Sequence, residues 1–137
     1  MIHLTSFADA KEHQIPKEKQ LSIDNTSPRW WKGVATLYPL TPGSIAWDYK
    51  KKSIGEKEYY DMYFNKLQRM TDQFDWKSLE EQYLLCWEPA GKFCHRIVLA
   101  FFLTLLGYQV ELDGKVYTTP EEINIPGVDP LTWKEKE

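Results

Sequence analysis

The sequence has few cysteines and little net charge. Its 137 residues include two cysteines, Cys86 and Cys94, and their spacing matches neither a Cys-x-x-Cys redox pair nor a zinc-binding knuckle. We therefore expect no metal site. We also expect no disulfide, because Cys86 lies in a predicted buried strand and the expected compartment is reducing. The net charge is −3 at pH 7, with both signs interspersed, which argues against nonspecific binding to a nucleic-acid backbone.

The sequence also lacks a long hydrophobic run. Its longest apolar segment, Ile97 to Leu106 with only Thr104 interrupting, is too short to span a bilayer. The first residues do not have the pattern of a secretory signal peptide. We therefore expect a cytoplasmic protein with reduced cysteines and no membrane partner. No motif indicates a cofactor.

Aromatic residues, in contrast, make up 15% of the chain, which is high enough that some should line a pocket or contact surface. The segment Arg29-Trp30-Trp31-Lys32 alternates cations with aromatics, a pattern that can stack on a ring and neutralise a phosphate. The alternative is that the two tryptophans cover a small core. Both interpretations remain open from the sequence.

The segment from Tyr83 to Leu112 predicts a strand, a helix and a second strand. Tyr83 to Trp87 is a continuous apolar run of strand length, typical of a strand covered on both faces. Cys94 to Leu106 has the length and composition of a buried helix, and Gly107 should end it. Tyr108 to Leu112 alternates like a strand, so we expect two parallel strands joined by a right-handed crossover.

These elements predict an α/β fold: a three-layer, Rossmann-like single domain with a mostly parallel central sheet. The α/β domain should span residues 1–115. Residues 116–137 should form a C-terminal edge strand and a proline-containing tail.

The loop from Glu88 to Arg96 is the predicted site, because ligands of open parallel sheets bind where strands end and helices begin. Lys92, His95 and Arg96 crowd the predicted helix N-terminus, although its partial positive charge favours anions. Glu88 could balance these cations by pairing with Arg96. A bound phosphate, sulfate or carboxylate could do the same, and the two interpretations can coexist.

The catalytic candidates in this loop are Glu88, Cys94 and His95. A thiolate at the helix start would be stabilised by the dipole and by His95, which allows nucleophilic or redox chemistry. Alternatively, Cys94 is a small buried hydrophobe, as free cysteines commonly are.

The ligand-binding candidates come from this loop and from other strand ends. The hydroxyls of Ser6, Ser22 and Ser27 should follow strands, although they could equally cap turns. Tyr59 lies on the apolar face of a helix predicted from Ile54 to about Met70. The full predicted set is Arg96, Lys92, Ser6, Ser22, Ser27, Trp30, Trp31 and Tyr59.

The string Leu85-Cys86-Trp87-Glu88-Pro89, followed by Phe93-Cys94-His95-Arg96 and a hydrophobic helix, resembles a bacterial and phage family known as domain of unknown function 488. Upstream strings agree with it: Thr5-Ser6, Ser22-Ile23, Ser27-Pro28-x-Trp30 and Tyr49-Lys50. The resemblance covers about residues 1–115. It implies a three-layer α/β fold and a shared site, but no known reaction.

Two functions are therefore expected. The first is binding of a nucleotide, nucleoside or other anionic small molecule at loop 88–96, with or without hydrolase or transferase turnover. Whether the protein is an enzyme is left open. The alternative is a non-catalytic phage or bacterial protein that binds a protein partner through its aromatic surface or C-terminal tail.

Overall fold

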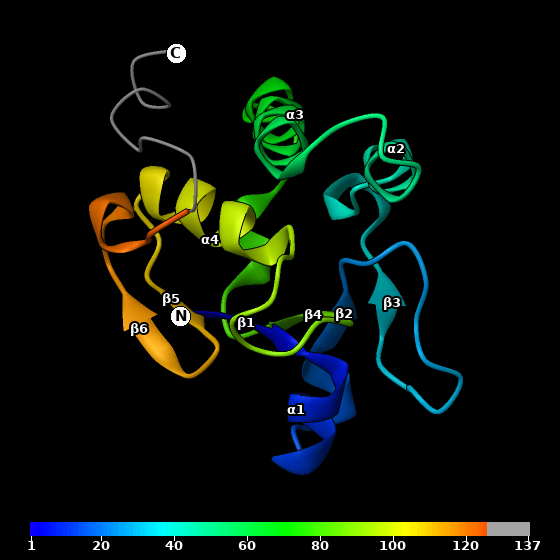
Figure 1. The fold of residues 1–137 in the computed structure, drawn as a ribbon. Coiled ribbons are helices and arrows are strands. Elements are labelled where there is room, and N and C mark those ends of the chain that lie inside the picture. The colour runs from blue at the N-terminus through cyan, green and yellow to red at the C-terminus, as the bar shows by residue number, and fades with distance from the viewer. Residues whose placement is uncertain (126–137) are drawn as a thin grey trace.

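The computed structural model describes residues 1–125, which build a six-stranded sheet with helices on both faces (Figure 1). The strand order is β3-β2-β4-β1-β5-β6. All neighbouring strands are parallel except β5 and β6, which form an antiparallel hairpin. The strands are β1 (Ile2–Ser6), β2 (Gln20–Ser22), β3 (Ala35–Thr36), β4 (Tyr83–Cys86), β5 (Val110–Leu112) and β6 (Lys115–Tyr117). The α/β class and the mostly parallel sheet are therefore confirmed.

The helices divide unequally between the two faces of the sheet. One face carries α1 (Phe7–Glu12), and the other carries α3 (Glu56–Arg69) and α4 (Arg96–Leu105), with α2 (Ser44–Lys50) beside α3 (Figure 1). Short 3₁₀ helices lie at 17–19, 38–40, 76–79 and 120–122. No helix of residues 1–125 is long and apolar enough to cross a membrane.

Strand β4 is covered on both faces, as its apolar composition predicts. Leu84 and Cys86 are fully buried in the main core beneath α3 and α4. Leu85, which points to the opposite face, packs with Phe7 and Ala10 of α1. Alternate residues of one strand thus connect the two helical layers.

The predicted strand-helix-strand unit is present with altered bounds. Helix α4 begins at Arg96, two residues after the predicted start, and Gly107 follows it at φ +97, a conformation that suits glycine. Strands β4 and β5 are parallel, but β1 lies between them and pairs with both. The crossover therefore skips one strand position.

The N-terminal region contains a helix that the sequence did not predict. Phe7 begins α1 directly after the last residue of β1. Ser6 caps this helix, since its Oγ accepts a hydrogen bond from the Asp9 N–H at 3.1 Å. This bond matches the capping alternative for Ser6.

A hairpin turn at Asp113-Gly114 joins β5 to β6, with φ +50 and +88 at the two turn residues, as a two-residue hairpin turn requires. Downstream, Ile123 and Ile125 are each 1% exposed and belong to the main core. The main core therefore includes residues of the C-terminal segment that begins at residue 116. Residues 126–137, the rest of the predicted tail, lie outside the described residues.

Candidate functional site

The carboxyl ends of β1, β2 and β4 meet at one edge of the sheet because these strands are parallel. The loop between β4 and α4 crosses this edge. Pro89 and Ala90 of the loop line a pocket of about 580 Å³, and Gly91 to Cys94 line a second pocket of about 370 Å³. Both pockets also contact Asp113. The predicted site thus coincides with two neighbouring hollows.

Arg96 is 2% exposed, and its guanidinium donates hydrogen bonds to three residues of the protein. Its Nη1 donates to the Glu88 carbonyl at 2.7 Å and to the Cys86 Sγ at 2.8 Å. Its Nε and Nη2 donate to the two carboxylate oxygens of Asp113, at 3.1 and 3.3 Å. Such a two-pronged pair is the strong form of an arginine–carboxylate contact.

The internal anion that balances Arg96 is therefore Asp113 and not the Glu88 carboxylate considered from the sequence. Asp113 lies 17 residues away in the chain, in the hairpin turn, and only the completed sheet brings it to Arg96. Glu88 contributes its backbone carbonyl instead. Its Oε2 is buried and has no hydrogen-bond partner among the described residues.

His95 and Cys94 form a buried pair at the start of α4. The Nε2 of His95 lies 2.6 Å from the Ile23 carbonyl oxygen. Because a carbonyl only accepts hydrogen bonds, Nε2 must carry the proton. In the neutral ring, Nδ1 then presents its lone pair to the Cys94 Sγ, 3.7 Å away. The imidazole is oriented to accept the thiol proton.

Burial sets the resting state of this pair. Cys94 is 3% exposed, and this desolvation raises the pKa of its thiol well above the usual range, with the neighbouring Cys86 adding to the shift. Cys94 therefore rests as a thiol near neutral pH. Burial lowers the pKa of His95, but its contacts with Cys94 and the charge of Asp24 raise that pKa above the ordinary value overall. A thiolate forms when His95 accepts the proton.

The two cysteines touch each other. Both are free, and their Sγ atoms lie 2.6 Å apart. A carboxylate oxygen of Glu88 joins them in a group whose ligand atoms all lie within 4.8 Å of one another. The eight-residue separation gave no indication of this contact, which arises because the loop turns back over the end of β4.

The smaller pocket brings together three of the predicted site residues: Lys92, Cys94 and Arg96. Lys92 is exposed, whereas the other two are buried. Tyr60 and Glu56 of α3 also line this pocket. A small ligand here would contact a thiol, an ammonium group and the N-terminus of a ten-residue helix.

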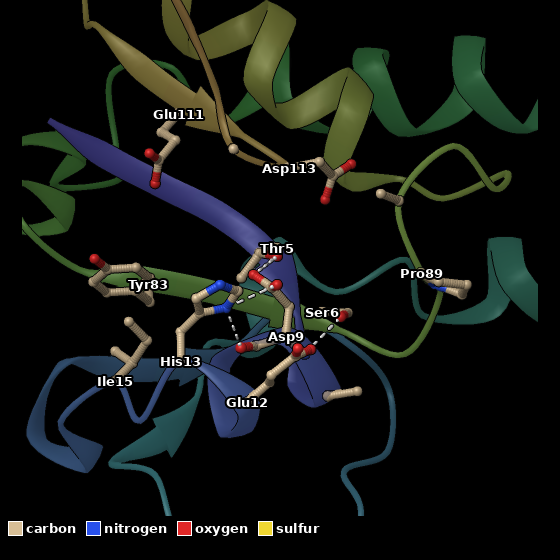
Figure 2. A pocket seen from close by; sticks show the side chains of 13 residues that line it. Thr5, Ser6, Asp9, Glu12, His13, Ile15, Tyr83, Pro89, Glu111 and Asp113 are labelled. Atoms are coloured by element: carbon tan, nitrogen blue, oxygen red, sulfur yellow. Dashed lines mark hydrogen bonds and ion pairs between the residues drawn. The ribbon is translucent and has the colours of Figure 1, made fainter.

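The larger pocket is acidic (Figure 2). Asp9 and Glu12 of α1 lie on one side of it, and Glu111 and Asp113 of the β5–β6 hairpin lie on the other. Asp9 accepts a hydrogen bond from the Thr5 hydroxyl at 2.7 Å. Carboxylates favour hydroxyl, amine or cationic groups over anions. Of the residues that line this pocket, the sequence analysis predicted only Ser6 as a site residue. Asp9 could have been noticed only from its position three residues after this capping serine.

His13 is the single basic side chain of this lining. Its Nδ1 lies 3.0 Å from the Asp9 carbonyl oxygen and 3.1 Å from the Asp9 carboxylate. The hydrogen bond to this carbonyl, together with the carboxylate charge, raises the pKa of His13 above its ordinary value. The pair neutralises part of the acidic lining when the imidazole is protonated.

The other predicted ligand-binding residues lie outside both pockets. The Oγ of Ser22 accepts from the Asp24 N–H at 3.2 Å, the turn-capping role that was its alternative. Ser27 lines neither pocket. Tyr59 is 5% exposed and packs against Phe93 in the core.

The two tryptophans also lie away from the smaller pocket. The Nε1 of Trp31 donates to the Gln20 side chain at 2.8 Å, and its ring packs edge-on against Phe7 on the α1 face. Trp30 is 45% exposed, with the Lys11 ammonium 4.6 Å from its ring centroid. Trp31 therefore covers a small core, which was the structural alternative for this segment.

No family model, curated protein or solved structure matches this chain. The resemblance to domain of unknown function 488 therefore stays a prediction.

Proposed function

We propose that the protein binds a small anionic molecule of the nucleotide class in the 370 Å³ pocket, and that Cys94 reacts with the ligand in any turnover. One observation carries the proposal. Cys94 lines this pocket, and its Sγ lies 3.7 Å from the Nδ1 of an imidazole whose orientation is fixed by the Ile23 carbonyl. A thiol next to an oriented base is the arrangement of an activated nucleophile.

The charges around this pocket support an anion. Arg96 and Asp113 neutralise each other, which leaves Lys92 as the cation of the adjacent loop. The N-terminus of α4 adds partial positive charge and backbone N–H donors. Glu56 is the opposing charge, and it is exposed to solvent. The charges around the smaller pocket therefore favour an anion more than those around the larger, carboxylate-lined pocket do.

The position of the pocket agrees with a Rossmann-like interpretation of the fold. In open sheets with helices on both faces, ligands bind outside the carboxyl ends of the strands. In the proposed reaction, Cys94 transfers its proton to His95 and attacks an electrophilic centre of the ligand. The bond from that centre to a leaving group breaks, and the leaving group takes the proton from His95. Water or a second substrate then releases the product, which corresponds to a hydrolase or a transferase.

Thermal unfolding with a panel of nucleotides, nucleosides and simple anions tests the proposal. A ligand present at one hundred times its Kd adds about 2.7 kcal/mol of stability, which is visible as a higher Tm. Replacing the exposed lysine, Lys92→Gln, should weaken binding of the best ligand about tenfold, since a charged hydrogen bond contributes about 1.5–3 kcal/mol. Lys77→Gln, an exposed change outside the pocket, should leave the affinity unchanged.

If no member of the panel raises the Tm, the proposal is contradicted. The alternative, a non-catalytic protein that binds a protein partner, would then be favoured. Several large aromatic side chains are available for such a surface: Trp30, Tyr38, Trp47 and Trp87 are each more than 40% exposed, at 45, 72, 57 and 48%.

A further inference from the structure

The contact between Cys86 and Cys94 has a chemical meaning of its own. The two Sγ atoms are 2.6 Å apart, about half an ångström longer than a disulfide bond of about 2.05 Å. We propose that Cys86 and Cys94 are a redox-active dithiol pair, which a peroxide entering the smaller pocket oxidises to an intramolecular disulfide. This proposal does not depend on the ligand of that pocket.

The neighbours of the two sulfurs distinguish this chemistry from metal binding. Glu88 supplies a third possible ligand atom within 4.8 Å of the sulfurs, whereas a structural zinc site has four ligands. The Arg96 guanidinium already donates to the Cys86 Sγ, and a cation at that sulfur disfavours a metal ion beside it.

The neighbours of each sulfur supply what thiol oxidation requires. Arg96 Nη1 donates to the Cys86 Sγ at 2.8 Å, so a buried guanidinium stabilises negative charge on that sulfur. The His95 Nδ1 faces the Cys94 Sγ at 3.7 Å and can accept its proton. Cys94 lines the pocket, whereas Cys86 is fully buried. A reagent from solvent therefore meets Cys94 first, and Cys86 is the resolving thiol.

The reaction balances with hydrogen peroxide as the oxidant. The Cys94 thiolate attacks one peroxide oxygen, the O–O bond breaks, and the other oxygen leaves as water with the proton held by His95. Cys94 is now a sulfenic acid. The Cys86 thiolate attacks the Cys94 sulfur, the S–S bond forms, and the S–O bond breaks to release a second water. Two thiols and one peroxide give one disulfide and two waters.

Oxidation would also regulate the proposed nucleophile. Cys94, which would form the disulfide, is also the cysteine that lines the pocket, so an oxidised protein has no Cys94 thiol to react with a ligand. Reduction by a small dithiol would restore it. The oxidation state of the Cys94 sulfur thereby determines whether the proposed reaction with a ligand can occur.

The test uses the full chain in its native state. Reduced protein is treated with hydrogen peroxide, quenched, unfolded and alkylated, and its intact mass is measured. We expect the number of alkylated cysteines to fall from two to zero, with the loss of two hydrogen atoms. Trypsin cuts after Lys92, so the disulfide would join peptides 78–92 and 93–96. That linked pair should be present only without reductant.

Two variants show the order of events. Cys86→Ser should stop at a sulfenic acid on Cys94, detected as one added oxygen and trapped by dimedone. In Cys94→Ser, peroxide should not reach Cys86, because Cys86 is fully buried in the folded protein. Cys86 should therefore still be alkylated after the protein is unfolded. If wild-type protein keeps two alkylatable thiols at peroxide concentrations that oxidise free cysteine, the proposal is overturned. One equivalent of zinc, retained through dialysis, would overturn it as well.

Discussion

At the residue scale, the Asp113 carboxylate balances the charge that Arg96 brings to the N-terminus of α4. From the sequence, a guanidinium in the first turn of a buried helix indicated a compensating anion, either Glu88 or a bound ligand, because the helix dipole disfavours a cation there. The structure gives Arg96 four internal hydrogen bonds, of which the Asp113 carboxylate accepts two. The charge of Arg96 is therefore matched inside the protein before any ligand arrives.

We therefore expect Arg96→Gln to lower the free energy of unfolding by about 3–5 kcal/mol, because it leaves the Asp113 carboxylate without its charged partner. Asp113 is 20% exposed, so the lower end of that range is expected. Urea unfolding measures the change. Arg69→Gln, at an exposed position of α3, is the control and should change stability by less than about 0.5 kcal/mol. A fully stable Arg96→Gln variant that no longer binds anions would restore the ligand-binding interpretation.

Cys94 gives a second expectation at this scale. Burial raises the pKa of its thiol, so in folded protein alkylation of Cys94 should have its pH midpoint above 9. In urea the midpoint should return to about 8.5. The folded state thus keeps a proton that the unfolded state releases. The thiol therefore makes its full contribution to the free energy of unfolding below the pKa of the unfolded thiol. That contribution is lost as the pH rises through the pKa of the folded thiol.

Iodoacetamide labelling at a series of pH values, followed by peptide mass analysis, measures this midpoint. Labelling of folded Cys94 with an ordinary midpoint near 8.5 would show that His95 or Arg96 stabilises the thiolate more than burial disfavours it. That result would also predict faster oxidation by peroxide at neutral pH.

At the element scale, α3 combines a correctly predicted face with buried tyrosines. Tyr59, Tyr60 and Tyr63, at the spacing predicted for the buried side, are at most 5% exposed. Burial raises the pKa of Tyr60 to about 12 and raises those of Tyr59 and Tyr63 above the ordinary value. The hydroxyl of Tyr63 donates to the Leu40 carbonyl. The helix therefore packs well only while these phenols are protonated.

We expect stability to fall as pH rises above about 10, where unfolded tyrosines ionise and the buried ones do not. Tyr63→Phe should cost about 1–3 kcal/mol at pH 7, because the Leu40 carbonyl loses its donor. The same variant should lose less stability than wild type between pH 7 and 10.5, since it has one fewer buried phenol. Urea unfolding at both pH values measures this. Tyr38→Phe, which is 72% exposed, should keep the wild-type dependence.

Elements with a strong local pattern were the ones that the sequence predicted correctly. The apolar run of β4, the uniform hydrophobicity of α4 and the three-and-four spacing of α3 each identify an element without knowledge of its neighbours. Helix α1 was missed because six residues show less than two turns of periodicity, and because Lys11 and Glu12 resemble a charged connector. The limits of α4 shifted because Cys94 and His95 take part in loop contacts before the helix begins.

The candidate site was predicted in position but not in its contacts. Cys94, Lys92 and Arg96 meet at one pocket because they are neighbours in the chain and follow one strand. The contacts of Arg96 with Asp113 and of Cys94 with Cys86 depend on strand order and loop path, which local patterns do not specify. Trp30 and Trp31 belong to a sequence pattern that can bind a ring and a phosphate. In the structure, however, their positions follow from packing on the α1 face of the sheet.

At the scale of the whole molecule, the sheet joins distant parts of the chain. Strand β1, at the N-terminus, lies between β4 and β5. Leu4 is in register with Leu84 on one side and with Leu112 on the other. The strand-helix-strand unit that dominates the sequence therefore has no continuous sheet without the first six residues. We infer that β1, β4, α4 and β5 unfold together.

The substitution Leu4→Ala tests this inference. Leu4 is 1% exposed, so its loss should leave a cavity and cost about 2–5 kcal/mol. Because the cavity would lie at the centre of the sheet, urea unfolding should move to lower concentration as one transition with an unchanged slope. Val116→Ala on the edge strand β6, where Val116 is 43% exposed, should cost less than about 0.5 kcal/mol. Two separate transitions in Leu4→Ala, with α4 retained after the first, would show that the β4–α4–β5 unit is stable without β1.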